Sequence, residues 1–416
     1  MQTRLPQTLR NTEEGAEAEE ILRKCVHCGF CNATCPTYQV LGDELDGPRG
    51  RIYLIKQMLE GHATTAQTQL HLDRCLTCRN CETTCPSGVQ FGRLLETGRR
   101  QLALQTPRPL AVRAARRALA AFLHQPTLFS TALRLGQFMQ PVLPAAVSEK
   151  IPPRAQSGGK WPTRVHPDKV LALAGCVQPA MSPGINLATA QVLDALGVQM
   201  VMANHAGCCG AIPLHLGFDE DALIDARRNI DAWWPWVERG VKAIVMNASG
   251  CGVTVKDYGR LLRHDMCYAA KAERIAALTV DVSEFLDGYT DQLHRLIKPL
   301  GTRTVAFHPP CTLQHGQQIR GKVEAILSVL GITVKLPQNA HLCCGSAGTY
   351  SILQSELSKT LRDKKCEALS HLGAQCVVSA NIGCICHLQT GTSIPVMHWV
   401  ELVAQLLGTA REIESS

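Results

Sequence analysis

The chain has 416 residues, of which 45% are apolar and 19% charged, with a formal net charge of +7. This length predicts two or three domains, because single cores stop growing at roughly 250–300 residues, and the composition excludes a wholly disordered chain. No stretch approaches the ~20 apolar residues of a membrane span, and the charged N-terminus contains no apolar run of a secretory signal.

The first hundred residues contain two copies of a cysteine pattern. Each copy reads Cys-x2-Cys-x2-Cys-x3-Cys-Pro, the ligand pattern typical of bacterial ferredoxins with two [4Fe–4S] clusters. Its cysteines are Cys25, Cys28, Cys31 and Cys35 in the first run and Cys75, Cys78, Cys81 and Cys85 in the second. Between the runs, residues 51–61 have apolar residues at helical spacing and end in glycine, which predicts a helix.

The pattern predicts that the two runs share their ligands. Three cysteines of a run can wrap one cluster, whereas the fourth reaches the other cluster. We therefore expect one cluster on Cys25, Cys28, Cys31 and Cys85 and the other on Cys75, Cys78, Cys81 and Cys35. A pair of zinc sites is the alternative, because zinc also binds Cys-x2-Cys pairs. Both runs end in Cys-x3-Cys-Pro, whereas zinc ribbons use two separated cysteine pairs. The spacing therefore favours iron–sulfur clusters over zinc.

Residues 106–165 are predicted to form a basic helical connector after a ferredoxin-like domain at 1–105. No acidic residue lies between Glu96 and Glu149, whereas this interval carries seven arginines. A helical projection of 112–124 places a basic face opposite an apolar one. The basic face contains Arg113, Arg116, Arg117 and His124. We interpret it either as a contact for anionic lipid or an acidic partner, or as a solvated surface. Nucleic acid is not expected, because no aromatic residues alternate with these arginines.

The rest of the chain alternates short apolar runs with helical stretches, which predicts parallel α/β units. Strands are expected at 170–174, 199–203, 243–247, 303–307, 333–336 and 375–380. Helices are expected at 186–196, 222–237, 323–330 and 352–369. An internal repeat with an offset of 135 residues relates the Cys-Cys-Gly triplet at 208–210 to that at 343–345. The prediction is an α+β multidomain protein with similar α/β domains at 166–295 and 296–416.

Eight further cysteines occupy repeated positions after the predicted strands. They are the candidate redox thiols Cys176, Cys208, Cys209, Cys251, Cys311, Cys343, Cys344 and Cys384. The carboxyl ends of parallel strands meet at one edge of a sheet, so we expect these thiols to converge, where they could hold a further cluster. The alternative is that they are buried as small apolar residues.

The two copies differ at their last cysteines. The second copy has Cys384-x-Cys386, whereas the first has Cys251 alone, which leaves open whether both copies bind metal. Three cysteines without a repeat partner, Cys267, Cys366 and Cys376, are interpreted as structural. His308, near Cys311, is interpreted as a hydrogen-bonding neighbour of the site rather than as a ligand.

Together these motifs resemble a known family. The repeated Cys-Cys-Gly pattern resembles the CCG domain of heterodisulfide reductase, anaerobic glycerol-3-phosphate dehydrogenase and lactate-utilisation proteins. The N-terminal runs, with a helix between them, resemble the α-helical ferredoxin domain of succinate dehydrogenase iron–sulfur subunits. The whole layout, with the phrases at 46–51, 247–252 and 308–316, most resembles the glycolate oxidase (glycolate dehydrogenase) iron–sulfur subunit.

The resemblance implies an electron-transfer subunit at the cytoplasmic face of a membrane. Partner subunits with FAD would oxidise glycolate to glyoxylate, and this chain would pass the electrons to a quinone or another non-NAD acceptor. The sequence has no Gly-x-Gly-x-x-Gly or P-loop motif, which agrees with a flavin held elsewhere. The alternatives are a subunit of a lactate or glycerol-3-phosphate dehydrogenase, a disulfide-reducing enzyme and a zinc-stabilised scaffold.

Overall fold

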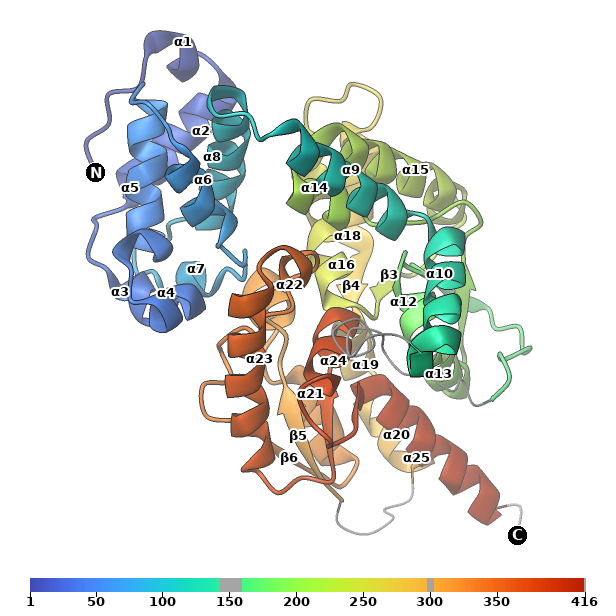
Figure 1. The fold of residues 1–416 in the computed structure, drawn as a ribbon. Helices are drawn as coiled ribbons and strands as arrows, with labels where there is room; N and C mark the ends of the chain where they lie inside the picture. Colours follow the sequence, from blue (N-terminus) through green and yellow to red (C-terminus); the bar gives the residue numbers. More distant parts are fainter. Residues whose placement is uncertain (143–158, 298–302, 415–416) are drawn as a thin grey trace.

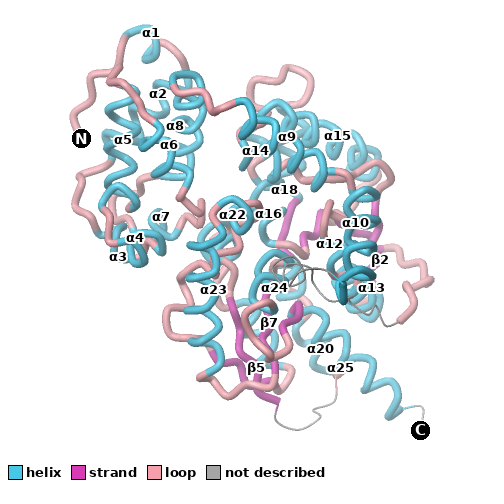
Figure 2. Tube along the Cα trace, viewed as in Figure 1, coloured by secondary structure: helices cyan, strands magenta, loops and turns pink. Residues whose placement is uncertain are grey.

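The computed structural model describes residues 1–142, 159–297 and 303–414. Figure 1 shows a helical N-terminal part in blue, a pair of connecting helices in teal and two α/β units in green to yellow and in orange to red. In Figure 2 the strands lie only within these α/β units. The expected α+β multidomain architecture is confirmed, whereas the domain boundaries themselves stay predictions.

The N-terminal part is a bundle of short helices. Its elements are α1 (Gln7–Arg10), α2 (Glu13–Lys24), α3 (Phe30–Ala33), α4 (Pro36–Leu41), η1 (Glu44–Asp46), α5 (Pro48–Leu59), α6 (Ala66–Asp73), α7 (Asn80–Thr84) and α8 (Phe91–Gln105). The helix predicted at 51–61 is found as α5. Its apolar face packs through Ile52 and Ile55 against Leu94 and Leu95 of α8, which forms the core under the cysteine loops.

The connector consists of α9 (Leu110–His124), α10 (Pro126–Met139) and η2 (Gln140–Val142), and its remaining part at 143–158 lies outside the described residues. The predicted basic face of α9 binds acidic groups of the same chain. Arg116 contacts Asp73 at 3.2 Å, and Arg117 pairs with Asp221. Arg116 is therefore largely buried against an acidic group of the same chain, whereas Arg117 stays 58% exposed, as expected of a solvated basic face. The expected contact with anionic lipid or an acidic partner stays a prediction.

Each α/β unit is built on a four-stranded parallel sheet. The first has the order β2-β1-β3-β4, with β1 (Asp168–Ala172), β2 (Val198–Met202), β3 (Ile244–Met246) and β4 (Thr279–Asp281). The second has the equivalent order β6-β5-β7-β8, with β5 (Arg303–His308), β6 (Ile332–Lys335), β7 (Cys376–Ser379) and β8 (Val396–His398). The six predicted strands are found, whereas β4 and β8 were not predicted because each is a three-residue run that continues directly into a helix.

Helices cover the sheets of both units. In the first unit they are α12 (Gln178–Met181), α13 (Gly184–Ala195), α14 (Ala211–Leu216), α15 (Asp219–Glu238), α16 (Ser249–Lys256), α17 (Tyr258–Leu261), α18 (Ala269–Leu278), α19 (Val282–Asp287) and α20 (Thr290–Leu296). In the second they are η3 (Thr312–Gly316), α21 (Lys322–Val329), α22 (Tyr350–Leu353), α23 (Ser355–Ser370), α24 (Ile382–Gln389) and α25 (Trp399–Glu414). The single helix predicted at 352–369 is wrong, because Gln354 leaves helical geometry and separates α22 from α23.

The two α/β units share one hydrophobic core. Val170 and Val192 of the first unit belong to the same buried cluster as Val305 and Trp399 of the second. Helices α13 and α25 pack against each other within this cluster. The relative position of the two sheets is therefore set by apolar burial rather than by a flexible linker.

Candidate iron–sulfur and thiol sites

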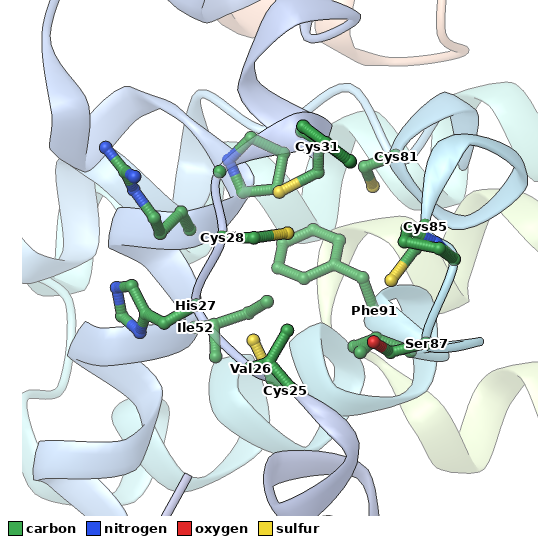
Figure 3. A pocket seen from close by; sticks show the side chains of 16 residues that line it. Cys25, Val26, His27, Cys28, Cys31, Ile52, Cys81, Cys85, Ser87 and Phe91 are labelled. Atoms are coloured by element: carbon green, nitrogen blue, oxygen red, sulfur yellow. The ribbon is translucent and has the colours of Figure 1, made fainter.

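The first pocket lies in the N-terminal part and is lined by five thiols (Figure 3). Cys25 and Cys28 come from the loop between α2 and α3, Cys31 from α3, Cys81 from α7 and Cys85 from the end of α7. Apolar side chains, with Phe91 among them, complete its wall. The fourth cysteine of the second run thus lies with the first three of the first run.

The second pocket adjoins the first and is lined by Cys35, Cys75, Cys78 and Cys81. Cys81 lines both pockets, so the two sites share a wall. The structure therefore brings the cysteines together in the two expected groups. Their assignment as cluster ligands stays a prediction.

The lining of both pockets fits a [4Fe–4S] cluster. Each pocket offers at least four thiols within a mainly apolar wall, and four thiolates are the donor set that such clusters use. Burial raises the pKa of Cys31 to about 11 and the pKa of Cys78 and Cys81 well above the usual thiol range. Free thiols at these positions hold their protons, and metal binding must displace them.

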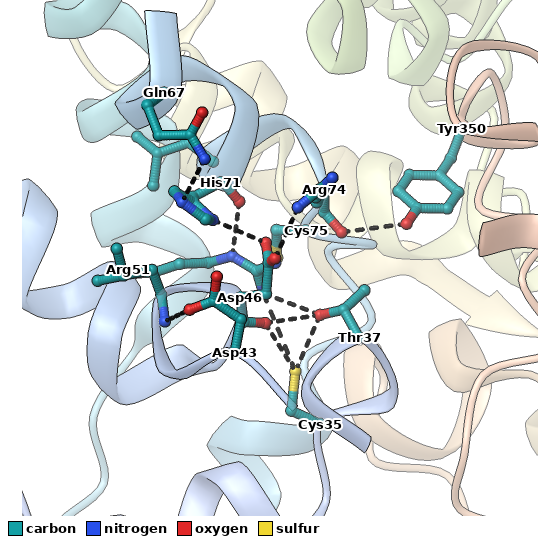
Figure 4. A network of polar contacts seen from close by, with 12 residues as sticks. Cys35, Thr37, Asp43, Asp46, Arg51, Gln67, His71, Arg74, Cys75 and Tyr350 are labelled. Atoms are coloured by element: carbon teal, nitrogen blue, oxygen red, sulfur yellow. Dashed lines mark hydrogen bonds and ion pairs between the residues drawn. The ribbon is translucent and has the colours of Figure 1, made fainter. Parts of the chain in front are cut away.

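A buried ion pair supports the second pocket (Figure 4). Arg51 and Asp46 are 1% and 0% exposed, and the Arg51 guanidinium lies 3.4 Å from Asp46 Oδ1. The same guanidinium donates to Thr37 Oγ1 at 3.1 Å and lies 3.9 Å from Cys35 Sγ. Its positive charge therefore lies beside a candidate ligand, where it would stabilise a negatively charged cluster.

The Asp46 carboxylate also holds the second cysteine run. Arg74, the residue before Cys75, contacts Asp46 Oδ2 at 2.8 Å, and His71 Nδ1 lies 3.1 Å from Asp46 Oδ1. Arg51 in turn donates to the His71 carbonyl oxygen at 2.8 Å. This network joins the turn before α5 to the loop that carries Cys75.

In the first α/β unit, four cysteines follow three adjacent strands. Cys176 follows β1, Cys208 and Cys209 follow β2, and Cys251 lies in the first turn of α16 after β3. Their thiols act on one another in a row, Cys176 on Cys208, Cys208 on Cys209 and Cys209 on Cys251. The predicted convergence at the carboxyl edge of the sheet is found.

The second α/β unit repeats this arrangement with Cys311, Cys343, Cys344 and Cys384. The Cys311 thiol donates to the sulfur of Cys343 at 3.8 Å, and the sulfur atoms of Cys344 and Cys384 lie within 4.8 Å of each other. The triplet needs its glycine, because Gly345 has a φ of +92° and a Cβ atom there would lie 2.5 Å from the Ser358 carbonyl oxygen.

The remaining cysteines lie apart from these groups. Cys386 packs against the shared core, because residues two apart on α24 point to different sides of the helix. Cys366 and Cys376 are buried in apolar clusters, as expected of structural residues. The same expectation for Cys267 is wrong, because its side chain is exposed.

The second unit contacts the second cysteine run directly. Asn80 donates to the His341 carbonyl oxygen at 3.2 Å, and Thr83 is hydrogen-bonded to His315 Nδ1 at 2.8 Å. Cys78 packs against an apolar cluster that contains Cys311 and Cys343. Sequence reasoning missed this neighbourhood, since more than 200 residues separate the partners and no local pattern records the contact.

Charged and polar side chains around the two CCG groups differ. In the first unit, the ligand atoms of His124, Cys208 and Asp225 lie within 4.8 Å of one another. In the second unit, the same limit holds for His308, Cys344 and Cys384. Burial holds the pKa of His308 well below its usual range.

Family comparisons agree with these sites. The model of the 4Fe-4S dicluster domain matches residues 21–89, and that of the cysteine-rich domain matches 170–256 and 305–389. The glycolate oxidase iron-sulfur subunit of Escherichia coli is 50% identical over 407 residues, which cover 98% of this chain and 99% of that protein. The chain belongs to the glycolate oxidase iron–sulfur subunit family.

The chain is less similar to two further relatives and to one solved structure. A probable glycolate oxidase iron-sulfur subunit of Bacillus subtilis is 28% identical, with 93% of this chain and 94% of that protein covered. Lactate utilization protein A of Bacillus pumilus is 25% identical over 56% of this chain and 98% of its own length. A hypothetical protein from Helicobacter pylori shares the fold, with a TM-score of 0.54 and 11% identity over 97% of this chain and 74% of that one.

Within the described ranges, no helix has both the length and the apolar composition that a membrane crossing needs.

Proposed function

We propose that this chain is the electron-transfer subunit of a glycolate-oxidising complex. Partner subunits with FAD oxidise glycolate to glyoxylate, and this chain passes the electrons to a quinone or another non-NAD acceptor. It does not oxidise the substrate alone. The proposal is supported by the 50% identity to the Escherichia coli subunit over nearly the whole chain.

One observation carries the proposal, namely the continuous row of thiol sites. The first pocket shares Cys81 with the second, and Cys78 of the second packs with Cys311 and Cys343 of the second α/β unit. Iron–sulfur clusters, when bound, supply one-electron transfer. The chain's own residues would hold these groups one after another along this row.

Burial of the CCG thiols disfavours the alternative of a disulfide-reducing enzyme. Cys208, Cys209, Cys343 and Cys344 are each at most 3% exposed. Thiol–disulfide exchange requires a sulfur atom that the substrate can reach.

We further propose that the protein is cytoplasmic and lies peripherally on the inner face of the membrane. Helices α9 and α10 expose apolar side chains, among them Leu110, Leu135 and Phe138. Arg113 and Arg134 are exposed on the same two helices. An apolar surface with neighbouring cations suits the interface of an anionic bilayer.

Reduction of the complete complex by glycolate tests the main proposal. The chain is purified without oxygen together with its flavoprotein partners, and the visible absorbance of the clusters is followed after glycolate is added. We expect bleaching with glycolate, recovery after a quinone analogue is added, and no bleaching of the chain alone. Bleaching by lactate or glycerol 3-phosphate but not by glycolate would assign the chain to another dehydrogenase.

A further inference from the structure

The two CCG repeats carry cysteines at four equivalent positions. They differ at the position three residues before the first of these cysteines. Strands β1 and β5 begin at Asp168 and Arg303, which differ by the repeat offset of 135 residues. Leu173 in the first repeat therefore corresponds to His308 in the second. Leu173 packs in an apolar cluster, as its side chain requires. His308 is 1% exposed, so the second repeat buries an imidazole where the first buries a hydrocarbon.

This buried imidazole has no hydrogen-bond partner. Neither Nδ1 nor Nε2 of His308 is satisfied by any residue that the structure describes. An unsatisfied buried polar group destabilises a fold, so one that a native protein retains calls for an explanation such as a role in binding a ligand. Its ring nitrogen lies within 4.8 Å of the sulfur atoms of Cys344 and Cys384, which is a suitable arrangement for a shared metal.

A second difference concerns charge. The glycine of each triplet approaches the backbone of a following helix, which identifies equivalent positions in the two repeats. A Cβ atom at Gly210 would lie 3.0 Å from the Ala222 carbonyl oxygen, and one at Gly345 would lie 2.5 Å from the Ser358 carbonyl oxygen. Counting from Ala222 and Ser358 along α15 and α23, the buried Asn229 therefore corresponds to the buried Lys365. The neutral side chain of the first repeat is replaced by a cation in the second.

Lys365 needs a negative partner that the described side chains do not include. Its ammonium group is 4% exposed and donates to the Asn339 carbonyl oxygen at 2.7 Å, with no carboxylate beside it in the described ranges. Buried charges are normally paired, and a negatively charged centre bound by the thiols of the second repeat would supply the missing partner of Lys365. In the first repeat a buried carboxylate, Asp225, lies beside Cys208 instead.

The donors of the second repeat extend beyond the reach of one ion. His308, Cys344 and Cys384 form a compact inner group, whereas Cys311 and Cys343 pack toward the ferredoxin part beside Leu76. A row of four thiols and one imidazole suits a centre with several iron atoms and sulfide. Its position next to Cys78 places it in line with the second pocket.

We propose that the second CCG repeat holds an iron–sulfur centre in which His308 supplies a nitrogen ligand beside Cys344 and Cys384. The first repeat, with Leu173, lacks this ligand. This inference rests on the proposed electron-transfer function and adds a centre next to the second pocket.

Pulsed electron paramagnetic resonance of the full chain, purified without oxygen, tests the inference. Protein labelled with ¹⁵N only in histidine is partly reduced and examined for a nitrogen bound directly to iron. We expect this coupling in the native protein and in His341→Ala, a control from the same repeat, and its loss in His308→Ala. His308→Cys, which keeps a ligand, is expected to retain the iron of the repeat while the coupling disappears.

The outcomes separate this inference from the proposed function. A native protein with both N-terminal clusters but without histidine coupling, or with the coupling intact in His308→Ala, overturns the histidine ligand alone. Zinc in the second repeat in place of iron, found by metal analysis, also overturns it. Absence of the N-terminal clusters themselves would instead contradict the proposed electron-transfer function.

Discussion

Tyr350 in α22 donates its hydroxyl hydrogen to the carbonyl oxygen of Arg74, the residue before Cys75, at 3.1 Å. The bond links the second α/β unit to the loop of the second cysteine run. It acts together with the contacts of Asn80 and Thr83, so the second pocket and the second CCG group are held at a fixed separation.

Tyr350→Phe is expected to lower the free energy of unfolding by about 1 kcal/mol, because the Arg74 carbonyl loses its partner in a part-buried place. Thermal unfolding of the oxygen-protected protein measures this. Tyr53→Phe is the control, since its hydroxyl accepts a bond from Gln57 at the surface. Equal losses in the two variants would contradict a special role for Tyr350.

Each cysteine run is proposed to supply one ligand to the cluster of the other run. A single substitution of that ligand should therefore damage the cluster of the other run. Cys85→Ser should impair the cluster of the first pocket, and Cys35→Ser that of the second, because each side chain lies with the other run. Iron analysis and the two cluster signals in electron paramagnetic resonance measure the loss. If each variant instead damaged the cluster of its own run, the proposed ligand assignment would be wrong.

Arg51→Gln is expected to destabilise the protein by about 1–3 kcal/mol, because it removes one partner of the buried Asp46 carboxylate, which keeps Arg74 and His71. Arg49→Gln provides a matched control two residues away. Arg49 pairs with Glu44, both partly exposed, and its loss should cost only about 0–1 kcal/mol. Denaturant unfolding compares the two variants, and similar values would refute the importance of burial here.

Lys365→Met should lower the reduction potential of a centre in the second repeat, because a positive charge that stabilises the added electron is removed. A change on the order of 60 mV corresponds to a tenfold shift of a one-electron equilibrium. Redox titration measures it, with the exposed neighbour Lys364→Met as control. Without a negative centre, the same substitution would simply remove an unpaired buried charge and stabilise the fold.

The exposed apolar face of α9 and α10 predicts membrane binding that depends on hydrophobic side chains. The double variant Leu135→Ser, Phe138→Ser should bind anionic vesicles roughly tenfold more weakly, because side chains of this size lose their burial in lipid. Vesicle sedimentation measures the binding. Leu336→Ser, at an exposed leucine of the second unit, is the control, and unchanged binding of the double variant would reject the membrane proposal.

Local patterns predicted those features that local physics determines. The cysteine spacing indicated the two thiol groups, and the apolar runs indicated six of the eight strands. Long-range packing determined the rest. The pairing of Arg117 with Asp221 and the contact of Tyr350 with Arg74 join segments more than 100 residues apart, and no pattern in the chain records them.

The common core of the two α/β units has an evolutionary consequence. Equal strand order in both units indicates duplication of an ancestral gene segment, after which each copy could change its chemistry. Because Val170 and Val305 lie in one buried cluster, deletion of the first copy would expose the apolar residues that it shares with the second. Selection on folding therefore preserves both halves, and specialisation is confined to a few side chains at the edges of the sheets.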